Sequence, residues 1–557
     1  MSFQGASRFI IEGGSFTNIA RDQHNYVQGN LVQYVNGEKG ERTIWDEFTR
    51  IPLGKIRIKK TLTRTKARRT DFKDRSWRNV DAHRTVNIAS IQGEDKDSEF
   101  LHITYSGPDA SETFHRDFQQ FSHVRDVTVA QLFGYNDGQF ALPALIFYDA
   151  LVPVAHIFER NGFSPLLYTY LDYLFGVMHT GTMDFGELWL HPRTGMLCTG
   201  PFVDYSGVQS FTASGFKTNS VTSDECPSLS LQTYSDSNTL ISFLTRTLST
   251  QNIIKGICCT YKLTWEKVSN KNAQSVLSCL SGTVYSRTHH RIIAQWPGDM
   301  EKWHYKPWGV RGLPDEMQES WVNMGDGLVR ITVLPLNVQH LQDQEFGVGY
   351  DLLSSEEWWD SWLSQAHSIL SQCGFQESDL EDCSIMDGLW LSLQYEDKHS
   401  TQTSSNASTD KPVYLFILPI PYPSDPETTW NSWLQGSKYF WSFDPSGNKK
   451  IPEDIRLSLG LPSFTSWLEF PHCWWDCITY NALHQLHVIK GFNPTTTAFA
   501  QSLGYPLLEV IGDEACFEEI EESPQDTKAI DVVDELTILL SKLTINPVES
   551  IIDIDSD

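Results

Sequence analysis

The chain has 557 residues, of which 40% are hydrophobic and 12% aromatic, so it is long enough for about two to four domains with filled cores. Its net charge of −27 argues against a surface that binds nucleic acid or anionic membranes as a whole. Ten scattered cysteines are typical of reduced thiols in the cytosol or nucleus. No signal peptide is evident, and no apolar run reaches the ~18 residues of a membrane span. We therefore expect an intracellular protein, nuclear or cytoplasmic.

Residues 1–40 form a β-prone leader rich in Gly and Asn. Two runs, 9–19 and 26–35, alternate polar with apolar residues and carry little charge. Such segments stack as strands between chains, so residues 1–37 are a candidate for self-association. The alternative is a short hairpin or a loose leader.

The charge of the chain falls into blocks of opposite sign. In the basic segment 41–84, Lys55–Arg84 contains 12 Lys or Arg and three Asp, a local charge of +9. The acidic tail 513–557 contains 14 Asp or Glu and two Lys, a local charge of −12. These blocks either meet within the molecule or serve separate partners. A two-part nuclear import signal, for which a solvated basic loop is the alternative, is predicted at Lys59, Lys60, Lys66, Arg68 and Arg69.

Residues 85–300 begin with a strand, a helix and two more strands, as judged from apolar periodicity and turn residues. This is the order of a protein-kinase small lobe. A Ser/Thr-rich stretch within the region, 206–238, is predicted to be a long loop. The predicted elements are a strand at 100–107, a helix at 110–123, strands within 127–135 and 141–148, a helix at 168–179, a hairpin at 189–198 and a strand at 256–263.

The groups that a kinase uses for phosphate transfer are missing from these positions. Kinases need a glycine-rich cover, a lysine for the phosphates, a catalytic Asp and an Asp that holds Mg²⁺. Tyr105 stands where the lysine is expected, so Glu112 and Asp117 on the predicted helix have no lysine to pair with. Asp184 is the candidate base, and Gly200 begins the segment where the metal would be held. We expect no phosphate transfer and predict no cofactor.

A second α+β unit is predicted at 301–512. A helix at 356–370 places its Trp and Leu residues at helical spacing. Strands are predicted at 413–419 and at the start of 439–447, and residues 398–411 form an inserted polar loop.

Two groups of residues near the end of the chain are candidate binding sites. The spacing C-x3-C-x6-H-x2-H is shorter than a structural zinc site normally has, which favours an apolar helix with buried thiols and satisfied histidines. An aliphatic run flanked by acids resembles a SUMO-interacting motif, which adds a strand to a sheet edge. The zinc candidates are Cys473, Cys477, His484 and His487, and the SUMO-type motif is Ile551, Ile552, Asp553, Ile554 and Asp555.

A further resemblance extends over most of residues 1–510 and is carried by ten segments. They are Phe3–Ser7, Gly13–Asn18, Thr104–Glu112, Val129–Tyr135, Ile146–Pro153, Pro192–Cys198, Trp362–Ala366, Tyr439–Gly447, Lys490–Pro494 and Leu503–Leu507. In these the chain resembles a family of degenerate protein-kinase-like proteins from mushroom-forming fungi. One departure is Arg125-Asp-Val127, where Arg-His-Pro is expected.

The resemblance implies an α+β fold in which a kinase-like (pseudokinase) bilobal module precedes the second unit. With its catalytic positions vacant, the module is predicted to be a non-catalytic protein-interaction or regulatory module whose partners are proteins. Two alternatives remain open. One is an enzyme of another class, for example in secondary metabolism, with its site between the two units. The other is a signalling adaptor that assembles through the leader.

Overall fold

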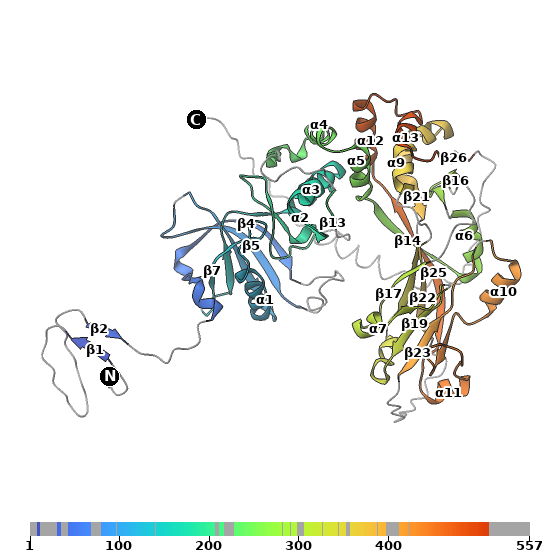
Figure 1. Ribbon diagram of the computed structural model, residues 1–557, viewed down its shortest axis with the longest axis horizontal. Coiled ribbons are helices and arrows are strands. Elements are labelled where there is room, and N and C mark those ends of the chain that lie inside the picture. Colours follow the sequence, from blue (N-terminus) through green and yellow to red (C-terminus); the bar gives the residue numbers. More distant parts are fainter. Residues whose placement is uncertain are drawn as a thin grey trace, which may run out of the picture.

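The computed structural model has a mixed α+β fold, as expected, with helices α1 to α13 and several sheets in the part of the chain that it describes (Figure 1). The described residues are 8–11, 31–34, 43–67, 80–95, 97–139, 141–205, 211–216, 228–280, 282–289, 291–297, 306–325, 327–343, 345–351, 357–386, 388–396, 412–422 and 424–511. In the leader, β1 (Arg8–Ile11) and β2 (Leu31–Tyr34) pair antiparallel within the chain, as the hairpin interpretation expects.

A six-stranded sheet, in the order β3-β7-β8-β6-β5-β4, forms the first part of the fold. Helix α1 (Ala110–Ser122) packs on it through Phe114, Phe118 and Phe121, which helical spacing places on one face. All neighbouring strands are antiparallel except β3 and β7. The strands are β3 (Thr49–Arg50), β4 (Ile56–Lys66), β5 (His83–Ile91), β6 (Phe100–Ser106), β7 (Leu132–Asn136) and β8 (Ala144–Phe147).

About half of the described residues of the basic segment belong to this sheet. Strand β4 lies entirely within residues 41–84, and β5 crosses from residue 84 to residue 85, where the sequence suggested a boundary. In β4 cations alternate with Ile at 56–59 and with Thr at 63–66, and this period of two is the period of a strand. Positive charge alone therefore does not separate this segment from the sheet that follows it.

Short strands and helices follow the sheet. Helix α3 (Pro165–Met178) starts at Ser164, whose side chain accepts a hydrogen bond from the Leu167 N–H, with Pro165 at the first helical position. The hairpin predicted at 189–198 is present as β11 and β12. The remaining elements are β9 (Val152–Pro153), α2 (Val154–Arg160), β10 (Met183–Asp184), β11 (Leu188–Leu190), β12 (Leu197–Thr199), β13 (Thr212–Ala213) and α4 (Ser237–Thr247).

The strand predicted at 256–263 is wrong except for its last two residues, which begin β14. Residues Thr250–Cys258 form helix α5, which Ser249 caps by accepting a hydrogen bond from the Asn252 N–H. A Cβ at Gly256 would lie 2.5 Å from the Thr169 hydroxyl oxygen, so the glycine allows α5 to approach α3 closely. A short apolar run does not distinguish a buried helix from a strand, and here the cap and the helix contact decide.

A nine-stranded sheet forms the second part of the fold, and its centre is the 11-residue strand β25. Strands β14 to β16 belong to this sheet, although they precede residue 301, where the sequence suggested that the second unit begins. Its strands are β14 (Lys262–Val268), β15 (Thr283–Ser286), β16 (Arg291–Gln295), β17 (Lys306–Arg311), β20 (Phe346–Asp351), β21 (Cys383–Met386), β22 (Gly388–Tyr395), β25 (Phe464–Trp474) and β26 (Glu509–Val510).

A four-stranded sheet, β18-β19-β23-β24, packs on the lower half of the nine-stranded sheet as drawn in Figure 1. Val348 and Leu391 from the larger sheet share one core with Ile331, Leu415 and Trp441 from the smaller one. The strands are β18 (Val322–Asn323), β19 (Val329–Val333), β23 (Val413–Ile417) and β24 (Tyr439–Ser442), and short helices nearby are α6 (Ala273–Leu280), α7 (Asp315–Glu319), α8 (His340–Asp343), α10 (Glu427–Gln435) and α11 (Glu453–Ser458).

The upper helices in Figure 1 join the two parts of the fold. Helices α9 (Glu357–Cys373), α12 (Cys477–Ile489) and α13 (Ala498–Leu503) lie beside α3, α4 and α5, and one hydrophobic core runs through all six. Among the described residues, the junction between the two parts is therefore filled with buried apolar side chains, such as those of Leu171, Ile254 and Trp362.

Candidate functional site

A buried charged cluster links β5, β6 and α1. The guanidinium of Arg84 donates two hydrogen bonds to the Asp117 carboxylate, at 2.7 Å from Nε and 2.9 Å from Nη2. The Tyr105 hydroxyl donates to the same carboxylate at 2.7 Å. Arg84 Nη1 also donates to the carbonyl oxygen of Phe202 at 3.2 Å. The side chains of Arg84 and Asp117 are each only 1% exposed, so the pair is sealed from solvent.

Burial and the contacts with Asp117 determine the protonation states of Arg84 and Tyr105. Burial by itself lowers the pKa of Arg84, but the charge and hydrogen bonds of Asp117 raise it, and the net pKa lies above the ordinary value. Burial, followed by the Asp117 charge, raises the pKa of Tyr105 well above its ordinary value. The cluster is therefore a charged Arg–Asp pair with a neutral tyrosine donor. A two-pronged pair of this kind is rigid, and separating it costs the full desolvation of both charges.

The sequence analysis considered only a lysine as the partner of the acids on α1, and it did not foresee that an arginine pairs with Asp117. Its partner comes from β5, where Arg84 lies directly opposite Tyr105 of β6. Paired residues of neighbouring strands point to the same face, and here that face is covered by α1. The available signal was the alternation along β5, which places Arg84 on the buried side with Val86 and Ile88, where a charge needs a partner.

Asp184, the candidate base, is buried and bonded to its own loop. Its Oδ1 accepts hydrogen bonds from the Gly186 N–H at 2.6 Å and from the Tyr205 hydroxyl at 3.4 Å. A Cβ at Gly186 would lie 2.5 Å from the Phe202 ring, so that ring covers the loop. These contacts suit a residue that caps the turn 185–187.

The segment 200–204, where a metal would be held in a kinase, is packed against its neighbours. A Cβ at Gly200 would lie 2.5 Å from the Trp189 ring. The backbone N–H of Asp204 donates to the Thr65 hydroxyl at 2.8 Å, which attaches the segment to β4. Among the described residues, no group of three or more His, Cys, Asp or Glu side chains could hold a metal ion.

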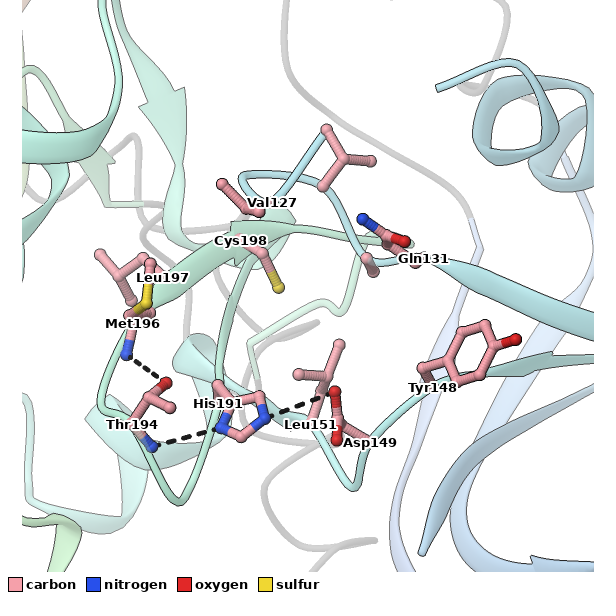
Figure 2. Close-up of a pocket in the computed structure, with 12 residues that line it drawn as sticks. Val127, Gln131, Tyr148, Asp149, Leu151, His191, Thr194, Met196, Leu197 and Cys198 are labelled. Carbon is pink, nitrogen blue, oxygen red and sulfur yellow. Dashed lines mark hydrogen bonds and ion pairs between the residues drawn. The ribbon is translucent and has the colours of Figure 1, made fainter. Parts of the chain in front are cut away.

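A pocket of about 440 Å³ opens beside the β11–β12 hairpin (Figure 2). It lies where the connection from α1 to β7, the connection from β8 to β9 and the β11–β12 hairpin meet. Its walls are mainly apolar, and three of its apolar or aromatic side chains are well exposed: Val127 at 73%, Tyr148 at 47% and Met196 at 41%. No lining residue comes from β4, β5 or the loop around Asp184.

The polar side chains of the pocket are fixed by contacts with one another and with the backbone. The Nδ1 atom of His191 accepts hydrogen bonds from the N–H groups of Arg193 and Thr194, at 3.3 Å each. Nε2 therefore carries the hydrogen and points at Asp149 Oδ2, 3.4 Å away, as Figure 2 shows. Asp149 has a φ of 64°, which is unusual for a residue other than glycine, and its carbonyl accepts the Leu101 N–H at 2.8 Å.

The pocket's cysteine is not poised to react. Cys198 is buried, and burial, followed by the charge of Asp149, raises the pKa of its thiol to about 12. A thiol of this kind stays protonated at neutral pH, and the thiolate is the nucleophilic form. With His191 held in one tautomer and Cys198 protonated, the pocket has the chemistry of a binding site, with mainly apolar walls and a few polar groups.

The four candidate zinc ligands do not converge in the structure. Cys473 is buried in β25, whereas Cys477 is exposed at the start of α12. His484 is exposed and His487 is fully buried on the same helix. The burial of Cys473 and His487 agrees with the apolar-helix interpretation, but Cys473 lies on a strand and neither ring nitrogen of His487 has a hydrogen-bond partner among the described residues, so the expectation of a satisfied histidine is wrong there.

The remaining predicted site residues fall partly outside the described residues. Lys59, Lys60 and Lys66 lie exposed on β4, and Lys59 pairs with Glu99 at 3.0 Å. Outside the described residues lie Arg68, Arg69 and the SUMO-type motif Ile551, Ile552, Asp553, Ile554 and Asp555.

Comparison with known proteins adds no relative: no protein-family model matches the chain, and no curated protein sequence matches it. In the described part of the chain, every helix is too short or too polar to cross a membrane.

Proposed function

We propose that the region around the six-stranded sheet is a non-catalytic kinase-like module that works through contacts with other proteins. Five of its strands are antiparallel in the order β4-β5-β6-β8-β7, with α1 between β6 and β7 in the chain. This order, followed by the hinge-like segment after β8, supports the small-lobe interpretation. In a kinase the phosphate-binding lysine lies on the third strand, which is β6 here, and its Glu lies on the following helix.

The Arg84–Asp117–Tyr105 cluster is the observation that carries the proposal. Tyr105 occupies the position of the lysine, and the cation comes from the neighbouring strand instead. Arg84 is 1% exposed, and its contacts with Asp117 and the Phe202 carbonyl use both edges of the guanidinium. A phosphate would have to displace Asp117 to reach this cation. The ion pair therefore stabilises the sheet and helix and contributes nothing to phosphate binding.

The exposed pocket supports the part of the proposal that the module works through contacts with other proteins. Its apolar walls and protonated cysteine favour binding over chemistry, and the exposed side chains of Val127, Tyr148 and Met196 surround it. The shared apolar core at the junction of the two parts argues against the alternative of an enzyme with its site there.

Thermal unfolding of the full chain with and without Mg-ATP tests the absence of nucleotide chemistry. We expect no change in midpoint and no radioactive phosphate incorporated from labelled ATP, with an active kinase run in parallel as a control. A raised midpoint together with autophosphorylation would overturn the proposal.

Complementation of cells that lack the chain tests the interaction role. Asp184→Asn should restore the wild-type phenotype, whereas Val127→Glu with Met196→Glu at the pocket rim should fail while the protein remains folded. Metabolite profiles of the deletion separate the enzyme alternative, because accumulation of one specific precursor would favour it.

A further inference from the structure

The outermost strand of the six-stranded sheet, β4, is an open edge. It pairs with β5 alone among the described residues, and nearly all of its side chains are exposed or half-buried. A strand in this position has backbone N–H and C=O groups that point away from its neighbour and are free to pair with an added strand. The edge is long, with 11 residues, although two register shifts interrupt its pairing with β5.

This edge is strongly basic. The cations on β4 outnumber its carboxylates five to none. Lys59 forms an ion pair with Glu99, and the other four form no ion pair with a described residue. Lysine on a sheet edge discourages pairing with neutral strands, because the incoming strand must desolvate the charge. An acidic strand is instead attracted to this edge, because its carboxylates can pair with the cations. The five cations are Arg57, Lys59, Lys60, Arg64 and Lys66.

The chain itself carries a segment that matches this edge. Residues 512–557 follow the described part, and from 513 onward they have a local charge of −12. Near position 550 they contain the β-prone run Ile551-Ile-Asp-Ile-Asp555, whose acids alternate with isoleucine. From residue 511 to residue 551 an extended chain spans about 130 Å. This exceeds the ~60 Å diameter of a compact protein of this size, so reach does not limit the contact.

We infer that the acidic tail adds its segment 551–555 as a strand to the basic edge of β4 in the same molecule. Main-chain hydrogen bonds of β-augmentation supply affinity. Asp553 and Asp555 would lie two residues apart on one face of the added strand, as Arg64 and Lys66 do on β4, and the pairing of these acids with these cations selects this strand over others. The contact does not depend on the proposed function. Because the same five residues form the SUMO-type motif, binding to β4 withdraws that motif from other sheet edges.

Zero-length cross-linking of the full chain tests this placement directly, because a carbodiimide joins a carboxylate to an amine only where the two are in contact. We expect mass spectrometry to identify links from Lys66 to Asp553 or Asp555. Hydrogen exchange of the β4 amides should be about tenfold slower in the wild-type chain than in an Ile552→Pro variant, since proline removes a donor and disrupts an added strand.

A charge exchange sharpens the test. Arg64→Glu with Lys66→Glu should abolish the cross-links and accelerate exchange in β4, and combining it with Asp553→Lys and Asp555→Lys should restore the slow exchange. The matched control is Lys449→Glu with Lys450→Glu, an exposed lysine pair away from β4, which should leave β4 exchange unchanged.

Two results would overturn the inference. One is a β4 exchange rate that is the same in the wild-type chain and the Ile552→Pro variant. The other is protection of β4 that grows with protein concentration, because that would place the tail of a second copy on the edge. Circular dichroism melting of each variant separates loss of the contact from loss of the fold.

Discussion

Two buried polar sites in this protein handle the cost of burial in opposite ways. At the Arg84–Asp117 pair every charged group has a partner, and the side chains stay ionised at 1% exposure. At His487 on α12 the imidazole is fully buried, and neither ring nitrogen has a hydrogen-bond partner among the described residues. Burial, with the nearby His367 and His484, lowers the pKa of His487 to about 4.

The difference shows what decides whether a buried group keeps its charge. Desolvation acts on both sites, but only Asp117 offers an opposite charge with matched geometry. His487 lies against the Phe499 ring, with a centroid distance of 4.0 Å, and His367, whose ring centroid is 6.5 Å away, cannot neutralise a proton on it. We therefore expect the first site to fail when a partner is removed and the second to fail when a proton is added.

Removing one member of the ion pair should have the largest effect. Arg84→Met leaves the Asp117 carboxylate buried without its cation, and the free energy of unfolding should fall by about 3–5 kcal/mol in urea titrations. The double variant Arg84→Met with Asp117→Leu should recover most of that loss, since no charge then remains buried. The control is Arg116→Met, which breaks the exposed pair with Glu112 and should cost less than about 1 kcal/mol. If Arg84→Met cost no more than this control, the pair would not stabilise the fold.

Acid should act on the second site. His487 has a folded pKa of about 4 and an ordinary value of 6.5, so between these values the unfolded chain binds the proton and the folded chain does not. The contribution of this residue is complete above pH 6.5, and stability should fall by about 3 kcal/mol as the pH drops to 4. His487→Leu should reduce the slope of stability against pH in that window. An unaltered slope in His487→Leu would refute the assignment.

Tyr105→Phe sharpens the comparison within the first site, because it removes one hydrogen bond and leaves both charges paired. We expect a loss of about 1–1.5 kcal/mol, well below that of Arg84→Met. An equal loss in the two variants would show that the tyrosine, and not the guanidinium, holds Asp117 in place.

Asp184→Asn should have the smallest effect. Asn accepts the Gly186 N–H as Asp does, so unfolding should change by only a few tenths of a kcal/mol. Asp184→Ala, which removes the acceptor, should cost about 1 kcal/mol. A large change in the Asn variant would mean that the charge of Asp184, beyond its role as an acceptor, matters to the fold.

Local pattern was enough to find many elements. The apolar spacing of Phe114, Phe118 and Phe121 predicted α1, and the tryptophans at helical spacing predicted α9. The turn at 136–138 separates β7 from β8 as expected, since Gly138 has a φ of 75° and its N–H is accepted by the Asn136 side chain. Each of these signals lies within a few residues of the element that it specifies.

Elsewhere the local signal was outweighed by contacts between residues that are far apart in the sequence. Residues 256–258 looked like a strand but end α5, where Gly256 meets Thr169 of α3. The basic segment looked separate, yet it supplies β4 and the buried Arg84, because the partners of Arg84 lie on β6 and α1. The pocket was not foreseen, since its three segments meet only after the strands have paired.

By itself, the sequence determined where the chain alternates, turns and caps, because those preferences arise from neighbouring residues. It also determined that position 105, where a kinase-like sequence is expected to have a lysine, holds a tyrosine. Only the tertiary structure decided which groups are paired. Asp117 acquires its cation from an adjacent strand and His487 acquires none, because burial and partnership depend on packing between segments that are far apart in the chain.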